Sequence, residues 1–191
     1  DTLSFELSVF GQRVVVNGGT SCYGVGSQRL RERETKAHST VEVAGQSSSE
    51  VWGGFRVARR ARPFGMVTHV QADHLEVACS HDGYRRLPGE PVHRREWRME
   101  AAGLRVSDRV MGGHHEAVAR FILHPLTQVS SAGAQAWHLC LQGGQRICMR
   151  VVKGAARLEP ASYAPEFGQV ISTQCLAVAL AGGEASVLFE W

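Results

Sequence analysis

The chain has 191 residues, of which 43% are hydrophobic, 20% charged and 7% aromatic, and its formal net charge is +3. This length can bury a substantial core in one domain, and the composition is too apolar and too weakly charged for a disordered chain. The modest charge gives no argument for nucleic-acid binding, and the sequence contains no run of 18 apolar residues that could form a membrane span.

The first residues already show the dominant pattern, which is alternation of apolar and polar side chains. Leu3, Phe5, Leu7 and Val9 alternate with polar residues, and this period of two predicts a half-buried strand. The pattern starts at once, without a methionine or the basic and apolar regions of a signal peptide. We therefore interpret the chain as a piece of a longer protein.

The same alternation recurs to the end of the chain and predicts many further strands. We expect them at residues 13–16, 40–43, 51–58, 65–72, 74–79, 93–99, 104–111, 117–123, 136–141, 146–152, 170–179 and 185–191. Glycine-containing turns at 101–103, 142–145 and 181–184 are typical of hairpins. Helical character is limited to residues 28–36. The expected fold is all-β, one large antiparallel β-sandwich of a dozen or more strands over residues 1–191.

The five cysteines form neither a CxxC pair nor a zinc-ribbon spacing. Cys140 and Cys148 flank the turn at 142–145 and could face each other across a hairpin, but we favour buried free thiols. The adjacent pair His114–His115 would point to opposite faces of a strand, so we do not expect it to chelate a metal. The sequence has no Walker loop, Rossmann fingerprint, HExxH or GxSxG motif.

Two polar segments interrupt the apolar pattern. One is residues 16–23, where a strand ends in Asn17 and two glycines. The other holds Arg29, Arg31, Arg33 and His38 shortly before the strand at 40–43. Arginine binds carboxylate or sulfate with two parallel hydrogen bonds, so these four residues are candidates for binding an anionic ligand. On the residues alone, a solvated loop with a lone histidine is the simpler interpretation.

Several segments, taken in order, resemble the C-terminal β-domain of heparinase II/III-like polysaccharide lyases. In that family a His-x-His-Ala-Asp stretch leads into Leu-Ser-Phe, then a strand ends in Val-Asp-x-Gly-Thr-Tyr, and Arg-x-x-x-Ala-His-Asn-Thr follows. This chain has similar residues at 1–7, 14–20 and 33–43, and further similarities at 81–84, 93–95, 108 and 121–125. The resemblance therefore covers most of the chain.

The resemblance implies one part of a larger enzyme, with an α/α-toroid domain upstream and an acidic polysaccharide bound between the two domains. The implied reaction is β-elimination, in which a base removes the C5 proton of a uronic acid and the glycosidic oxygen leaves C4. Positioned donors must first neutralise the neighbouring carboxylate. The family's catalytic histidine would precede Asp1, so we expect the chain alone to be inactive. Arg29, Arg31, Arg33 and His38 would then be substrate-binding residues.

The family also has a zinc site in this domain, formed by His, Asp and His. On this chain the aspartate corresponds to Asn17 and the second histidine to His38, while the first histidine would precede Asp1. A neutral amide is a poor zinc ligand beside a carboxylate. We therefore expect no cofactor in this chain. The resemblance also implies export to the periplasm or secretion by a bacterium.

The alternative function is a non-catalytic glycan-binding or structural β-module. Such modules usually stack sugar rings on exposed aromatic side chains. Trp52, Trp97, Trp137 and Trp191 lie within predicted strands, and we expect them in the core, which favours packing over sugar stacking. A cupin-like metalloenzyme lacks support because the chain has no His-x-His motif.

Overall fold

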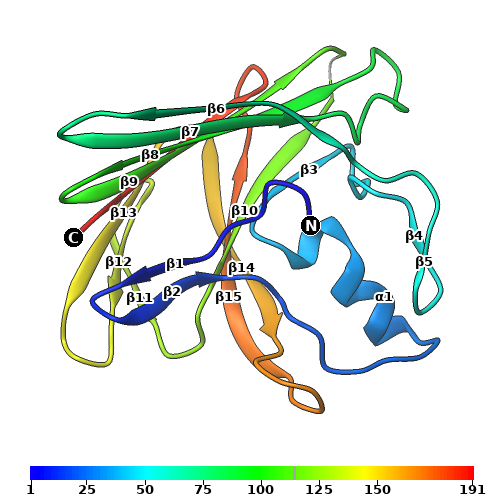
Figure 1. Ribbon diagram of the computed structural model, residues 1–191. Helices are drawn as coiled ribbons and strands as arrows, with labels where there is room; N and C mark the ends of the chain where they lie inside the picture. Colours follow the sequence, from blue (N-terminus) through cyan, green and yellow to red (C-terminus); the bar gives the residue numbers. More distant parts are fainter. Residues whose placement is uncertain (114) are drawn as a thin grey trace.

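The computed structural model describes residues 1–113 and 115–191, and Figure 1 shows two main β-sheets packed face to face. All strand pairs within the three sheets of this described part are antiparallel. The all-β sandwich expected from the sequence is therefore confirmed. His114, half of the adjacent histidine pair, lies outside the described residues.

The smaller main sheet contains six strands of the described chain. Their order is β1 (Leu7–Val9), β2 (Gln12–Val16), β10 (Ala117–Leu123), β15 (Ile171–Ala179) and β14 (Ala155–Tyr163), and β3 (Val41–Val43) also pairs with β10. The β1–β2 turn has positive φ at both Phe10 and Gly11, the backbone of a tight type I′ hairpin.

The larger sheet contains eight strands of the described chain. Their order is β11 (Gln128–Gly133), β12 (Ala136–Cys140), β13 (Arg146–Lys153), β16 (Glu184–Glu190), β9 (Gly103–Met111), β8 (Val92–Glu100), β7 (His74–His81) and β6 (Pro63–Val70). A small hairpin of β4 (Val51–Trp52) and β5 (Arg56–Val57) stands apart from both sheets.

The core lies between the two main sheets and follows the alternation of the sequence. In β16, every second residue is buried. Phe121 of β10 meets Phe189 of β16 across the interface, with ring centroids 5.9 Å apart, and the Phe5 ring lies 6.1 Å from that of Phe121. Each such buried aromatic side chain stabilises the fold by about 1.5–3 kcal/mol relative to exposure.

Three expectations about strands need correction. Residues 51–58 form the β4–β5 hairpin rather than one strand, because Gly53 turns the chain with a φ of 60°. Residues 3–6 stay outside the sheets, and Leu3 has a φ of 58°. Strands β11 and β14 were not expected: β11 is almost wholly exposed and polar, and β14 contains Pro160, which this strand tolerates at the sheet edge.

The cysteines and tryptophans fall partly as expected. All five cysteines are free, but only Cys79 and Cys175 are buried, so the expectation of buried thiols fails for the other three. The hairpin of β12 and β13 does form, but Cys140 pairs with Arg146 and Cys148 with His138, so the two thiols are not opposite each other. Trp97, Trp137 and Trp191 pack against the core as predicted, whereas Trp52 is half exposed in the β4–β5 hairpin and is a correction.

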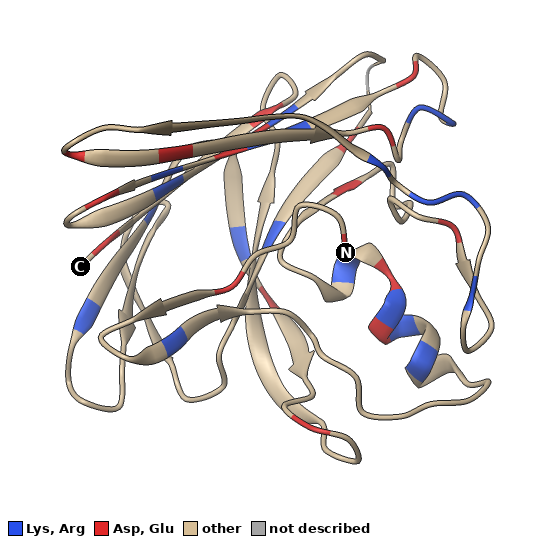
Figure 2. Cartoon of the chain, viewed as in Figure 1, with Lys and Arg blue, Asp and Glu red and all other residues tan. Residues whose placement is uncertain are grey.

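The helix α1 (Ser27–Arg33) and a short 3-10 helix (Thr35–Ala37) confirm the helical character expected near residues 28–36. They lie at one end of the sandwich, beside the N-terminus and the β4–β5 hairpin (Figure 1). Figure 2 shows basic positions along α1 and along the segment between β5 and β6 at this same end. Within the described residues, neither helix has the length and apolar character that crossing a bilayer requires.

Candidate functional site

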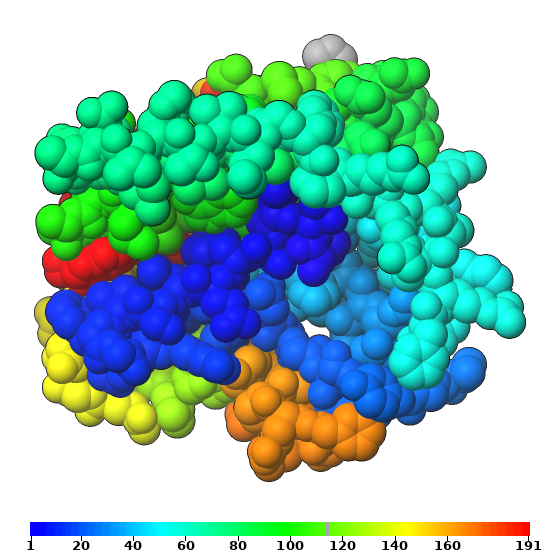
Figure 3. Space-filling model, in the orientation of Figure 1, coloured from blue at the N-terminus to red at the C-terminus, as the bar shows by residue number. Residues whose placement is uncertain are grey.

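A cleft of about 820 Å³ opens at this end of the sandwich, and we call it the N-terminal cleft. Figure 3 shows the surface hollowed close to the first residues of the chain. One side is formed by the N-terminal segment and by residues of β6, β7 and β8, of which Met66, Val77 and Trp97 are apolar. The other side is polar and is formed by α1 and the segment after it.

Two arginines of α1 form the polar side. Arg29 and Arg33 are four residues apart, so they share one face of the helix. Arg29 donates hydrogen bonds from Nε to the Gly54 carbonyl (3.3 Å) and from Nη1 to Thr20 Oγ1 (3.1 Å). Arg33 Nη1 donates to the Gly53 carbonyl (2.9 Å). These contacts orient both guanidinium groups but leave their charges without a counterion.

The main electrostatic feature of the cleft is that the positive charges of Arg29 and Arg33 have no carboxylate counterion in the described chain. Within residues 1–113 and 115–191, neither Arg29 nor Arg33 forms an ion pair with a carboxylate. Burial, and then the positive charge of Arg29, lowers the pKa of Arg33. Two like charges held side by side favour the binding of an anion between them.

Glu32 lies on the same helix as both arginines, but its carboxylate binds Ser21 and Gln28 instead of either guanidinium. Its carboxylate accepts hydrogen bonds from the Ser21 amide (3.1 Å), from the Ser21 hydroxyl and from Gln28 Nε2 (2.8 Å). Burial alone would raise the pKa of Glu32, but the bonds from Ser21 and Gln28 outweigh it and lower that pKa. Glu32 therefore fixes α1 to the loop that precedes it.

His38 lines the same cleft, directly after the 3-10 helix. Burial, reinforced by the positive N-terminal amine, lowers the pKa of His38 to about 4, although a hydrogen bond to the Glu32 carbonyl acts in the opposite direction. The imidazole is therefore neutral at pH 7. The cleft combines a neutral histidine with three arginines that form no ion pair in the described chain, Arg29, Arg33 and Arg60, and this combination suits a ligand that carries carboxylate or sulfate.

Arg31 is separated from the other predicted binding residues. Its side chain is exposed, donates to Gln28 Oε1 (2.6 Å) and lines a different hollow together with Lys36 and Arg120. The structure thus brings Arg29, Arg33 and His38 together and places Arg31 elsewhere. The helical period explains the separation, because residues two apart on a helix do not share a face.

Asn17 holds the main chain beside His38 and is a poor fit for zinc. Its Oδ1 accepts the Ser39 amide (3.0 Å) and its Nδ2 donates to the Phe5 carbonyl (3.5 Å). Among residues 1–113 and 115–191, no three His, Cys, Asp or Glu side chains gather closely enough to hold a metal ion. We therefore derive no chemical step through zinc.

A buried polar cluster lies behind the cleft, and we call it the histidine–aspartate cluster. It consists of His81, His93, Arg95 and Asp108, whose side chains are almost completely buried. Antiparallel pairing places His81 opposite His93 and Arg95 opposite Asp108. The sequence showed these residues only as parts of family segments. One feature of the sequence could have predicted a buried cluster. Asp108 lies between Val106 and Val110 in an alternating strand, so it occupies an inward position; Val106 is buried and Val110 half buried.

The hydrogen bonds of this cluster run in one direction. The Gly83 amide donates to His81 Nδ1 (3.1 Å), so His81 carries its proton on Nε2 and donates it to His93 Nδ1 (3.1 Å). His93 Nε2 then donates to Asp108 Oδ1 (2.7 Å). Burial lowers the pKa of both histidines, that of His81 to about 3, which keeps both rings neutral.

Arg95 completes the cluster and connects it to the cleft. It binds Asp108 with two bonds, Nε to Oδ1 (2.7 Å) and Nη2 to Oδ2 (2.9 Å). Burial alone would raise the pKa of Asp108, but Arg95 and His93 lower it to about 2. The remaining nitrogen, Nη1, donates to the carbonyls of Leu3 (3.1 Å) and Ser39 (2.6 Å). Arg95 thereby holds together the N-terminal segment and the segment that carries His38.

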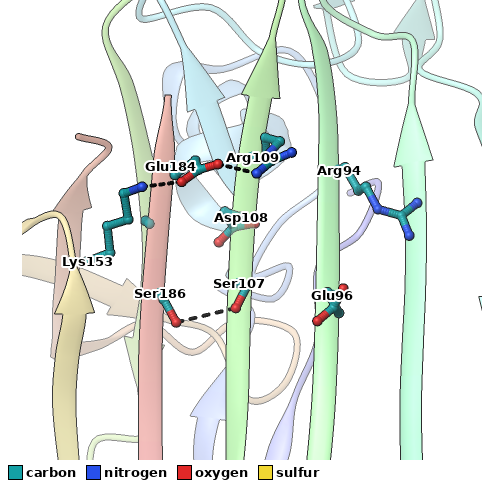
Figure 4. A pocket seen from close by; sticks show the side chains of 9 residues that line it. Arg94, Glu96, Ser107, Asp108, Arg109, Lys153, Glu184 and Ser186 are labelled. Atoms are coloured by element: carbon teal, nitrogen blue, oxygen red, sulfur yellow. Dashed lines mark hydrogen bonds and ion pairs between the residues drawn. The ribbon is translucent and has the colours of Figure 1, made fainter. Parts of the chain in front are cut away.

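A smaller pocket of about 330 Å³ lies on the outer surface of the larger sheet and is a weaker candidate. Figure 4 shows Glu184 between Lys153 and Arg109, with an ion pair to each. Ser107 and Ser186 hydrogen-bond to each other across neighbouring strands (3.3 Å). Basic Arg94, Arg109 and Lys153 are matched in number by acidic Glu96, Asp108 and Glu184 in its lining, so this pocket does not attract an anion as the N-terminal cleft does.

Comparison with protein families identifies the chain. The model of the family described as "Heparinase II/III-like, C-terminal" matches residues 1–187. This chain belongs to that family. The heparinase II/III-like resemblance found in the sequence is therefore confirmed. No curated protein sequence matches the chain closely enough to count as a relative.

Solved structures agree with the family in fold. The heparan sulfate lyase HepC from Pedobacter heparinus superposes with a TM-score of 0.77 at 13% sequence identity, covering 98% of this chain and 30% of that one. A heparinase III gene product superposes with a TM-score of 0.75 at 11% identity, covering 97% of this chain and 29% of that one. This heparinase II/III-like chain thus spans less than a third of the length of these lyases.

Proposed function

We propose that this chain is the C-terminal β-domain of a lyase that cleaves uronic-acid-containing polysaccharide by β-elimination. The N-terminal cleft binds the acidic groups of the polymer. The observation that carries the proposal is the pair Arg29 and Arg33, oriented by main-chain and threonine oxygens and left without a carboxylate partner in the described chain. Membership of the heparinase II/III-like family supports the reaction class.

The residues of the cleft suit a binding and neutralising role. In β-elimination a base takes the C5 proton, a C4–C5 double bond forms, and the C4–oxygen bond breaks so that the leaving oxygen takes the electron pair. The C5 proton becomes acidic enough only when cations or donors neutralise the adjacent carboxylate. Arg29 and Arg33 have free N–H groups for this purpose. Neutral His38 at the same wall can donate or accept a hydrogen bond.

The base and the leaving-group acid are expected outside this chain. By the family pattern, the catalytic histidine precedes Asp1 and further groups come from an α/α-toroid domain. Asp1 lines the N-terminal cleft, so residues joined to it in a longer protein would begin beside Arg29, Arg33 and His38. We further propose that the longer protein is exported to the periplasm or secreted, where an extracellular polymer is accessible.

A non-catalytic glycan-binding module is the second candidate, and half-exposed Trp52 favours it. The two candidates differ in the longer protein, where a lyase produces an unsaturated uronic acid that absorbs ultraviolet light and a binding module does not. For the 191-residue chain, both candidates predict binding of heparan sulfate fragments without cleavage.

Calorimetric titration of the chain with a heparan sulfate hexasaccharide tests the binding that both candidate functions predict. A hydrogen bond to a charged group contributes about 1.5–3 kcal/mol, so Arg33→Ala should weaken binding roughly tenfold or more. Arg31→Ala is the matched control and should change affinity little. Equal losses in both variants, or no binding by the unmodified chain, would contradict a binding role for the cleft. Absence of the ultraviolet product with the longer protein would contradict the lyase.

A further inference from the structure

Three aromatic side chains meet on the surface next to the N-terminal cleft, and we call them the aromatic rim. Tyr23, Phe55 and Phe167 come from three loops that are far apart in the sequence. The Tyr23 ring lies 5.7 Å from Phe55 and 5.2 Å from Phe167, measured between centroids. All three remain exposed, at 64%, 67% and 63% respectively. The rings therefore gather without burying one another.

Main-chain contacts hold these loops in place. The Gly168 amide donates to the Ser21 carbonyl (2.7 Å), which ties the loop of Phe167 to the loop of Tyr23. A Cβ at Gly54 would clash with the Gly24 carbonyl oxygen, so the loop of Phe55 also touches the loop of Tyr23 backbone to backbone. The rim is thus positioned by glycines and hydrogen bonds rather than by a hydrophobic core. A ligand would meet a surface that is already arranged.

Arg29 connects the rim to the cleft. Its guanidinium lies 5.5 Å from the Tyr23 ring centroid and 5.9 Å from that of Phe55, within the range of cation–π contact. The same guanidinium lines the N-terminal cleft. Its two hydrogen bonds, to Gly54 and Thr20, leave other N–H groups available. Apolar ring faces and an uncompensated positive charge are therefore adjacent on one continuous surface.

We propose that the aromatic rim is a second glycan-binding subsite that continues the N-terminal cleft. The proposal rests on the function proposed above. A pyranose ring has an apolar face of C–H groups and polar edges, so its face fits the exposed rings. A carboxylate or sulfate on the same or the next sugar reaches Arg29. This combination fits an acidic polysaccharide better than a neutral glycan or an aliphatic protein surface.

The test compares serine variants of the rim with a matched exposed aromatic elsewhere. Tyr23→Ser, Phe55→Ser and Phe167→Ser remove exposed rings, and Phe10→Ser is the control. Phe10 is 53% exposed in the turn between β1 and β2. Figure 1 shows this turn on the opposite side of the molecule from α1 and the β4–β5 hairpin. Each variant of the 191-residue chain is titrated with heparan sulfate fragments of two, four, six and eight sugars, and urea unfolding checks that the fold is retained.

For the longer fragments, we expect the Tyr23, Phe55 and Phe167 variants to bind roughly tenfold more weakly and the control to bind as the unmodified chain does. The loss should shrink for the disaccharide, because a short ligand can occupy the arginine side of the cleft without reaching the rim. Suppose that the rim variants bind every fragment as tightly as the unmodified chain while Arg33→Ala still loses affinity. The proposal of a second subsite is then wrong, and the proposed function of the cleft stands. If the unmodified chain binds no fragment, both are overturned.

Discussion

Arginine and histidine occur together in two neighbouring regions of this molecule, with opposite electrostatic outcomes. In the histidine–aspartate cluster, Arg95 is buried and bound by both oxygens of Asp108. In the N-terminal cleft, Arg29 and Arg33 are half buried and bind only neutral oxygens. The two regions are connected, since Arg95 holds the carbonyls of Leu3 and Ser39.

The difference indicates how to separate structural from functional charges. A buried ion that is fully paired has no capacity left for a ligand, and removing its partner leaves an unpaired charge in the interior. An oriented cation without a counterion contributes little to stability and keeps its capacity to bind. The same residue types therefore serve as framework in one region and as ligand-binding groups in the other. Changes in the first region should alter stability, and changes in the second should alter binding.

The largest expected effect is the loss of Asp108. Asp108→Ala leaves Arg95 buried without its counterion and should lower the free energy of unfolding by about 3–5 kcal/mol, measured by urea denaturation. The next residue on β9 supplies the control: Arg109→Ala removes only a surface ion pair with Glu184 and should cost at most about 1 kcal/mol. Similar losses of unfolding free energy in the two variants would contradict a stabilising role for the pair of Asp108 and Arg95.

Acid should destabilise the fold through the same cluster. The pKa of His81 falls from 6.5 in the unfolded reference to about 3, and that of Asp108 falls from 3.8 to about 2. The unfolded chain therefore binds more protons than the folded chain as pH falls below 6.5, so stability decreases with acidity. Urea unfolding midpoints at pH 7.5, 6 and 5 should decline in that order. A flat profile would exclude neutral buried histidines.

A smaller effect is expected for His38→Ala. Loss of its half-buried imidazole should lower the free energy of unfolding by about 1 kcal/mol. Zinc should raise the melting temperature little in either form, because Asn17 supplies no carboxylate. A large zinc-dependent rise in the chain that disappears in His38→Ala would show a metal site and contradict our interpretation of Asn17.

The alternation of apolar residues was enough to predict the sandwich and most of its strands, because one face of each such strand must be buried. It failed for β11, which buries almost nothing, and for β14, whose Pro160 is tolerated only at an edge.

The sequence also suggested Arg29, Arg33 and His38 as a group. It did not separate Arg31, and it could not show that Arg95 meets Asp108 or that Tyr23 meets Phe167, because these contacts depend on strand register and loop packing.

The salt dependence of heparan sulfate binding tests the central claim most directly. If uncompensated arginines of the cleft bind the acidic groups, the affinity of the chain for a heparan sulfate hexasaccharide falls as sodium chloride is raised, because salt screens exposed charges. Arg33→Ala should flatten this dependence, and Arg31→Ala should leave its slope nearly unchanged, while both variants unfold at the same urea concentration as the unmodified chain. An unchanged slope in Arg33→Ala, with a flattened slope in Arg31→Ala, would contradict the account.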